Sequence, residues 1–246
     1  MNETINIIKD HRSIRSFLDK DLEDSVIDEI LRAAQAMPNS INAQQSSVIV
    51  IRDKEKKAKI AQLAGGQKWV EDAPVFLLFI LDFYKTSLAA EKNGLTQVIH
   101  ESVEGTMAGT FDAGLSMGAA IIAAESMGLG IVPIGGIRKN PGELIKLLNL
   151  PSYTYPAVGL AVGYPKDRSH KKPRLPFSTF RHDEAYHKEG MKEAIDRYDM
   201  EMEEYLKEVG REQEGNWSKY TSGIYQNVYF PDVYPTMKDQ KFLNNK

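Results

Sequence analysis

The pattern of apolar and polar positions along the chain predicts helices that alternate with buried strands. It indicates helices over residues 2–10, 23–37, 54–63 and 141–148. It indicates strands over residues 48–51, 74–81, 131–134 and 157–162. The run 74–81 is apolar throughout, which is typical of a strand buried on both faces. Buried strands that alternate with helices favour an α/β sandwich with a parallel sheet.

The longest predicted helix, residues 97–127, is rich in glycine and alanine. A glycine inside a helix costs about 1 kcal/mol relative to alanine. Small residues are therefore expected where another backbone packs closely, so we expect a central, buried helix that could also meet a partner subunit. The glycines at 128 and 130 end this helix.

The last third of the chain contains a helical seam and an aromatic tail. The seam recurs at spacings of four and three residues and consists of Met191, Ile195, Tyr198, Met202, Tyr205 and Val209. Either the chain's own core or a partner subunit could cover it. Residues 217–246 carry seven aromatic side chains, so we expect this tail to dock rather than float free.

Composition restricts the class of protein. The apolar content of 42% and charged content of 26% are those of a soluble globular chain, and the absence of cysteine excludes disulfides, thiolate nucleophiles and cysteine-ligated metals. A formal charge of −3 gives no field for nucleic acid or anionic lipid. The longest apolar run, residues 73–81, is far shorter than the roughly 18–20 residues of a membrane span. The first residues show no signal-peptide pattern, so we expect a cytoplasmic protein.

Two basic clusters could bind an anion. His11, Arg12, Ser13 and Arg15 place four possible donors to an oxyanion within five residues, although a solvated basic turn would have the same sequence. In residues 171–174, Pro173 fixes the backbone so that Lys172 and Arg174 point to the same side. An ordinary charged loop is the alternative for this second cluster.

Three further segments could contact a flat ligand. Residues 39–45 form a loop of amide and hydroxyl side chains, Gly65-Gly66-Gln67 follows a helix, and Pro133-Ile134-Gly135-Gly136 ends a buried strand. No dinucleotide fingerprint, phosphate-loop lysine, serine nucleophile elbow or zinc-type histidine pair is present. We therefore predict no catalytic side chain and no metal ligand, and expect a bound organic cofactor to carry any reaction.

Taken in order, these motifs resemble the FMN-dependent nitroreductase family. They are the segment from His11 to Arg15 with Phe17, the P-x-S-x-N-x-Q pattern of residues 38–44, Gly65-Gly66-Gln67, residues 133–136, and Lys172-Pro173-Arg174-Leu175-Pro176. The match is closest to the NADPH-dependent, oxygen-insensitive nitroreductase and flavin reductase branch. That branch has a C-terminal extension with a Trp-Ser pair, which is Trp217-Ser218 here.

The resemblance implies an α+β fold with a central, mostly antiparallel sheet flanked by helices, in an intertwined homodimer. It implies one FMN-binding domain over residues 1–246, with a core over about 1–180 and a C-terminal helix and aromatic tail over about 181–246 that dock on the dimer. The implied cofactor-binding residues are His11, Arg12, Ser13, Arg15, Ser40, Asn42, Gln44, Gln67, Ile134, Gly135, Gly136, Lys172 and Arg174.

The activity that the resemblance implies is NADPH oxidation by tightly bound FMN, with NADH as a possible donor. Two electrons pass by a ping-pong mechanism to a nitroaromatic, a quinone or free flavin, with neither nucleic acid nor membrane as a partner. Lys207, Arg211 and Lys219 are the nearby cations in the extension that could contact the 2′-phosphate of NADPH. The alternative is a protein that stores FMN or senses redox state without significant turnover.

Overall fold

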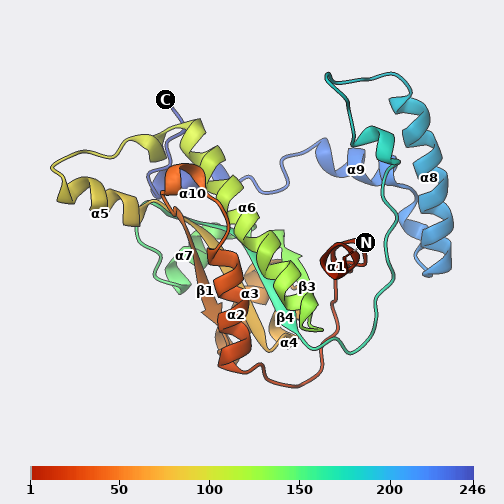
Figure 1. Cartoon of the computed structure of the whole chain (residues 1–246), viewed down its shortest axis with the longest axis horizontal. Coiled ribbons are helices and arrows are strands. Elements are labelled where there is room, and N and C mark those ends of the chain that lie inside the picture. The colour runs from red at the N-terminus through yellow and green to blue at the C-terminus, as the bar shows by residue number, and fades with distance from the viewer. Residues whose placement is uncertain (1) are drawn as a thin grey trace. The chain divides into compact units, whose positions relative to one another are not determined.

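An antiparallel sheet forms the centre of the larger of two units in the chain. The computed structural model describes residues 2–246, and it divides the chain into one unit of residues 1–169 and 230–246 and a second of residues 170–229. The strands are β1 (Ser46–Ile51), β2 (Val75–Asp82), β3 (Gly130–Ile134) and β4 (Thr154–Gly163), in the order β1-β2-β4-β3 (Figure 1). Each neighbouring pair is antiparallel. The antiparallel α+β fold is therefore confirmed, and the parallel sheet favoured by the apolar pattern is wrong.

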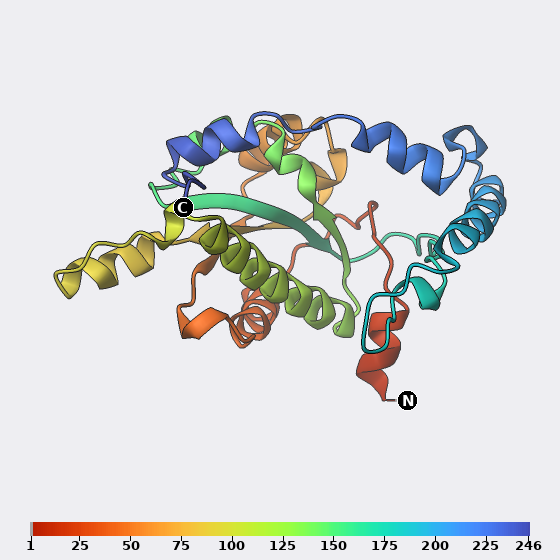
Figure 2. The ribbon, with the colours of Figure 1, turned by 90° about the horizontal axis from the view of Figure 1, so that it is seen from above.

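Helices cover both faces of this sheet, as the two views in Figures 1 and 2 show. The helices of this unit are α1 (Glu3–Lys9), α2 (Asp24–Gln35), α3 (Lys54–Leu63), α4 (Lys68–Asp72), α5 (Tyr84–Lys92), α6 (Val103–Ser126), α7 (Pro141–Leu147) and α10 (Val233–Asp239). Alternate residues of β2 pack with α3, α4 and α7 on one face and with α2 and α6 on the other. Burial on both faces explains the continuous apolar run in β2, because a central antiparallel strand covered twice has the same pattern as a parallel one.

Two prolines in the strands lie where the sheet tolerates them. Pro133 is on β3, an edge strand, where a missing N–H costs least. Pro156 is on the central strand β4, beside a register shift between Phe79 and Ile80 of β2. Such an irregularity admits proline inside a sheet. The strand predicted over 157–162 therefore begins earlier, at Thr154.

The glycine-rich helix α6 starts later than predicted and is buried along one face only. Residues 99–101 form a separate 3-10 turn, and the Ser102 hydroxyl caps α6 by accepting from the Gly105 N–H at 3.0 Å. A Cβ added at Gly109 would lie 2.5 Å from a methyl group of Leu81, so glycine allows α6 to pack closely on β2. The opposite face exposes Met107 and Phe111, which corrects the expectation of a fully buried helix.

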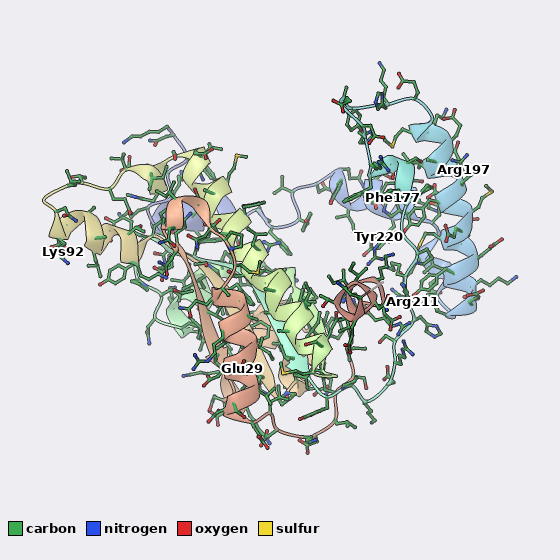
Figure 3. All side chains as sticks on the ribbon, in the orientation of Figure 1. Glu29, Lys92, Phe177, Arg197, Arg211 and Tyr220 are labelled. Atoms are coloured by element: carbon green, nitrogen blue, oxygen red, sulfur yellow. The ribbon has the colours of Figure 1, made fainter. Side chains whose placement is uncertain are left out.

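Two further features of this unit concern α5 and α6. Helix α5 has no buried residue and extends away from the sheet, with Lys92 at its far end (Figures 1 and 3). Among residues 2–246, α6 is the one helix long and apolar enough to cross a membrane. The core helix of a soluble protein passes the same test, and α6 packs on α2 and the sheet.

The second unit contains α8 (Met191–Glu208) and α9 (Trp217–Tyr225). Tyr198, Met202 and Leu206 of α8 form its core, with Leu175 and Trp217 packed against them. Tyr198 and Met202 of the predicted seam therefore pack within their own unit, while the other residues that α8 buries are Ala194 and Leu206, which are not in the predicted seam. The end of the aromatic tail returns to the sheet unit, where Phe242 is fully buried.

Candidate functional site

The basic segment at residues 11–15 runs along the edge of the sheet next to β3. The Ile14 N–H donates to the Ile131 carbonyl at 2.8 Å, and Ser13 forms a parallel bridge with Ile131. The Ile14 side chain is buried in the sheet unit and leaves no room at Gly130, where an added Cβ would lie 2.7 Å from it. The segment is therefore fixed to the sheet by its backbone and by one apolar anchor.

The three basic side chains of this segment have different partners. His11 Nδ1 lies 2.6 Å from the Glu125 carboxylate at the end of α6, and Arg12 Nη2 lies 3.1 Å from the Asp10 carboxylate. Arg15 instead places its guanidinium carbon 5.6 Å from the centre of the Trp69 ring. No carboxylate within residues 2–246 forms an ion pair with Arg15. Its charge is thus the one in this segment that no acidic side chain offsets.

Arg15 belongs to a set of residues that meet beside the end of β3, which we call the β3 cluster: Arg15, Gln67, Trp69, Gly135 and Gly136. Gln67 occupies the N-cap position of α4 and donates its side-chain amide to the Ala64 carbonyl at 3.0 Å. Gly136 lies against both groups, since an added Cβ would be 2.5 Å from the Ala64 oxygen and closer still to Gln67 Nε2. The backbone of residue 136 therefore lies so close to Ala64 and Gln67 that only glycine fits at this position.

The chemistry of the β3 cluster suits the FMN that the family resemblance implies. The indole N–H of Trp69 is buried and has no hydrogen-bond acceptor among the described residues, which leaves a donor for an incoming carbonyl or phosphate oxygen. Arg15 supplies a fixed positive charge, and Gly135 and Gly136 have no side chain of their own to stand between their backbone and a flat ring. Buried Ile134 precedes these glycines at the end of β3. The cluster therefore contains groups that can bind a phosphate, the face of a flat ring and the hydrogen-bonding edge of that ring.

The polar loop of residues 38–44, which we call the Ser40 loop, lies against α6. The Ser40 N–H donates to both carboxylate oxygens of Asp112, at 3.2 Å each. The Gln44 N–H donates to Asn39 Oδ1 at 2.9 Å. Ile41, Asn42 and Gln44 all have positive φ angles, and the Ile41 side chain is 93% exposed. Left-handed backbone is costly for a β-branched residue, so this loop holds a strained and exposed conformation.

Within one chain, the structure does not bring the Ser40 loop to the other candidate residues. The loop is attached to α6 on one face of the sheet, whereas Trp69 and its helix α4 lie on the other face. His11 is attached to the same helix at Glu125, which lies about 20 Å along its axis from Asp112 at 1.5 Å per residue. Ser40, Asn42 and Gln44 are thus separate from the β3 cluster in a single copy.

The remaining candidates belong to the second unit. Arg174 donates from Nη1 to the carbonyls of Lys172 and Pro173, at 3.0 and 3.3 Å. The Tyr198 hydroxyl also donates to the Pro173 carbonyl, at 2.9 Å, so the core of this unit fixes that proline. Arg211, a candidate for the NADPH 2′-phosphate, forms a forked pair with the Glu214 carboxylate at 2.5 and 2.8 Å. The role of Lys172 and Arg174 in binding FMN stays a prediction.

Sequence reasoning missed two residues of interest, Trp69 and Asp112. Trp69 lies in a short, mostly polar helix and Asp112 in a long, mostly apolar one, and neither residue matches a recognisable motif. Trp69 follows Gln67 by two positions, so its proximity to a candidate residue was the only available signal. Nothing in the sequence connects Asp112 with Ser40, which is 72 residues away.

Comparison with known proteins gives a consistent result along the whole chain. Residues 8–164 match the model of the nitroreductase family, and residues 172–245 match that of the nitroreductase family C-terminal domain. The FMN reductase [NAD(P)H] of Bacillus subtilis is 44% identical over 100% of both chains. The structure of B. megaterium NfrA2 is 46% identical, with a TM-score of 0.97 over 100% of both chains.

A third relative is more distant but also similar throughout. The structure of the NADPH:FMN oxidoreductase from Vibrio harveyi, solved with NAD+, is 31% identical, with a TM-score of 0.90 over 100% of both chains. The two family models together cover most of the sequence, and the fold agrees over its full length. The chain therefore belongs to the nitroreductase family.

Proposed function

We propose that this protein is an FMN-dependent NADPH oxidoreductase that reduces small-molecule acceptors. The acceptors are nitroaromatics, quinones or free flavin, and donor and acceptor use the same site in turn. The observation that carries the proposal is the β3 cluster, in which an unpaired cation, an unpartnered buried indole N–H and two glycines converge. Full-length relatives that are named as FMN reductases support the same activity.

The residues of the chain would bind and orient the cofactor, while bound FMN supplies a carrier that accepts hydride from the nicotinamide and passes two electrons on. In this proposal, Arg12, Ser13 and His11 would donate to the phosphate and ribityl oxygens. Arg15 is assigned to the pyrimidine end of the ring, where a positive charge favours the electron-rich form. The backbone at Ile134, Gly135 and Gly136 would face the ring and leave its other face open for substrate.

We further propose a homodimer, in which the Ser40 loop of one copy completes the FMN site of the other. This arrangement would explain why Ser40, Asn42 and Gln44 are separate from the β3 cluster within one chain. Each dimer would then contain two equivalent sites.

The exposed face of α6 supports the dimer. Phe111 is 67% exposed, and no atom of the chain lies within 4 Å of a Cβ added at Gly114 or Gly118. This face forms a hollow with Ala33 and Met37 of the α2 region. An apolar surface of this kind, with small residues at its centre, suits close packing against a second helix. The protruding helix α5 offers additional contact area for the partner.

NADPH is the proposed donor, and the cytoplasm, where reduced nicotinamide nucleotides are available, is the proposed location. The forked Arg211–Glu214 pair leaves Arg211 partly neutralised, so we expect NADH also to be used, at lower efficiency. The ratio of kcat/KM for the two donors tests this order. Equal values, or a preference for NADH, would contradict it.

The activity is tested by adding NADPH to the purified protein under anaerobic conditions and recording the visible spectrum. We expect a yellow protein whose flavin band bleaches with NADPH and returns when a quinone or nitroaromatic is added. A colourless protein that takes up no FMN would refute the proposal. A flavin that stays oxidised under excess NADPH would favour the alternative, an FMN store or redox sensor.

A further inference from the structure

Asp112 is a buried carboxylate in an otherwise apolar part of α6. Its residue is 2% exposed, and no cation forms an ion pair with it in the described part of the chain. Burial raises the pKa of Asp112, and the hydrogen bond from Ser40 acts against that rise. An ionised group in such a place is unfavourable unless it has a specific partner. Its partner is the Ser40 backbone N–H, which both oxygens accept.

The Ser40 loop needs an anchor. Three of its non-glycine residues have positive φ angles, and its tip, Ile41, projects into solvent. An exposed loop would relax to a less strained backbone if nothing held its ends. Asp112 holds the beginning of the loop, and the Asn39 side chain holds the end by accepting from the Gln44 N–H. Of these two anchors, only Asp112 belongs to another element of the fold.

We propose that Asp112 is a positioning residue, whose carboxylate fixes Ser40 so that the Ser40 loop keeps the conformation that binds FMN. Asp112 does not itself touch the cofactor. It acts through the Ser40 N–H, and it fixes the loop to the same helix that forms the proposed dimer contact. This inference rests on the proposed function, because it takes the Ser40 loop to be part of an FMN site.

The main test compares Asp112→Ala with Asp112→Asn and with Glu104→Ala. Glu104 is an exposed acidic residue on the same helix that lines the same hollow as Ser40, and among the described residues it forms no hydrogen bond with Ser40, so it serves as the charge control. Loss of a hydrogen bond to a charged group should raise the FMN Kd of the Asp112→Ala apoprotein about 10-fold. Asp112→Asn keeps an acceptor and should stay within about 3-fold of the unaltered protein. Glu104→Ala should leave the Kd unchanged.

A second readout separates loop position from simple loss of stability. The visible circular dichroism of FMN-saturated protein reports the surroundings of the ring. We expect an altered band in Asp112→Ala and its recovery in Asp112→Asn. If Asp112→Ala binds FMN with unchanged Kd and an unchanged band, the inference is wrong, although the proposed function stands. If Asp112→Asn is as weak as Asp112→Ala, the hydrogen-bond role is wrong.

A further pair of variants covers the case in which Asp112→Ala does not fold. Ser40→Pro removes the N–H donor, whereas Ser40→Ala keeps it and removes only the hydroxyl. Proline is tolerated here because Ser40 starts a 3-10 turn and Asn39 before it is extended. Ser40→Pro should bind FMN about 10-fold more weakly than Ser40→Ala. Equal affinities would overturn the inference. If the unaltered protein and the Glu104→Ala variant both fail to bind FMN, the proposed function itself is refuted.

Discussion

Gly136→Ala tests whether the close packing of the β3 cluster is required. The new methyl group would lie 2.5 Å from the Ala64 carbonyl oxygen, which is below the separation that real Cβ atoms adopt. Gln67 could rotate away, but the backbone oxygen of Ala64 could not. The segment after β3 and the end of α3 must therefore separate, and Gln67 must lose its hydrogen bond to Ala64.

The magnitude follows from overpacking and from the lost contact. Overpacking of a buried site costs about 1–3 kcal/mol. For a chain of this length, that corresponds to a fall in Tm of roughly 2–10 °C. A displaced Gln67 and a shifted glycine backbone should together raise the FMN Kd about 10-fold. Melting of the apoprotein and fluorescence titration with FMN measure the two effects separately.

The matched control is Gly142→Ala in α7. A Cβ there would meet only Thr236, at 3.9 Å, and alanine is the better helix former. Its Tm should be unchanged or raised, and its FMN affinity should be unchanged. If Gly136→Ala matched Gly142→Ala in both measurements, the assignment of close packing at Gly136 would be wrong.

Three further predictions concern stability and assembly. Lys57→Met leaves the carbonyls of Ala73 and Pro74 without their buried ammonium donor. The free energy of unfolding, measured by chemical denaturation, should therefore fall by about 1–3 kcal/mol. Lys54→Met, at an exposed position, is the control and should have little effect. Burial lowers the pKa of His100 below its ordinary 6.5, so the unfolded chain binds a proton more readily and stability should fall as the pH drops below that value. The fall in Tm between about pH 7.5 and about pH 5.5 should therefore be smaller in His100→Gln, and an unchanged slope would contradict this reasoning. Gly118→Glu has room in the single chain but not in a packed interface, so light scattering should find a monomer that retains little FMN, while Gly223→Glu should remain dimeric.

The sequence predicted most strands and helices because their apolar patterns are local. It did not predict the direction of the strands. A run of apolar residues such as β2 shows that a strand is buried on both faces, but it does not show whether the neighbouring strands are parallel or antiparallel. The start of α6 was also missed. Its only signal is the single hydroxyl of Ser102, because the residues before and after this cap have a similar composition. The family resemblance, which rests on several motifs in order, corrected the direction of the strands.

The sequence predicted which types of residue form the candidate site, but not how these residues are arranged in space. The contact of Gln67 with Gly136 joins two of the predicted motifs, and the guanidinium of Arg15 reaches a third element through Trp69. The link between Asp112 and Ser40 depends on the tertiary packing of α6, which no local pattern encodes. The separation of the Ser40 loop from the β3 cluster likewise follows from the layers of the fold.

The central claim is that FMN is bound by the basic segment and the β3 cluster, and the FMN Kd of Arg15→Ala tests it most directly. Lys146→Ala is the control, since it removes one exposed positive charge that pairs with Glu143. Loss of a charge-assisted hydrogen bond should weaken FMN binding at least about 10-fold in Arg15→Ala and leave Lys146→Ala unchanged. Arg15→Ala protein that binds FMN as tightly as the Lys146→Ala control would contradict the account.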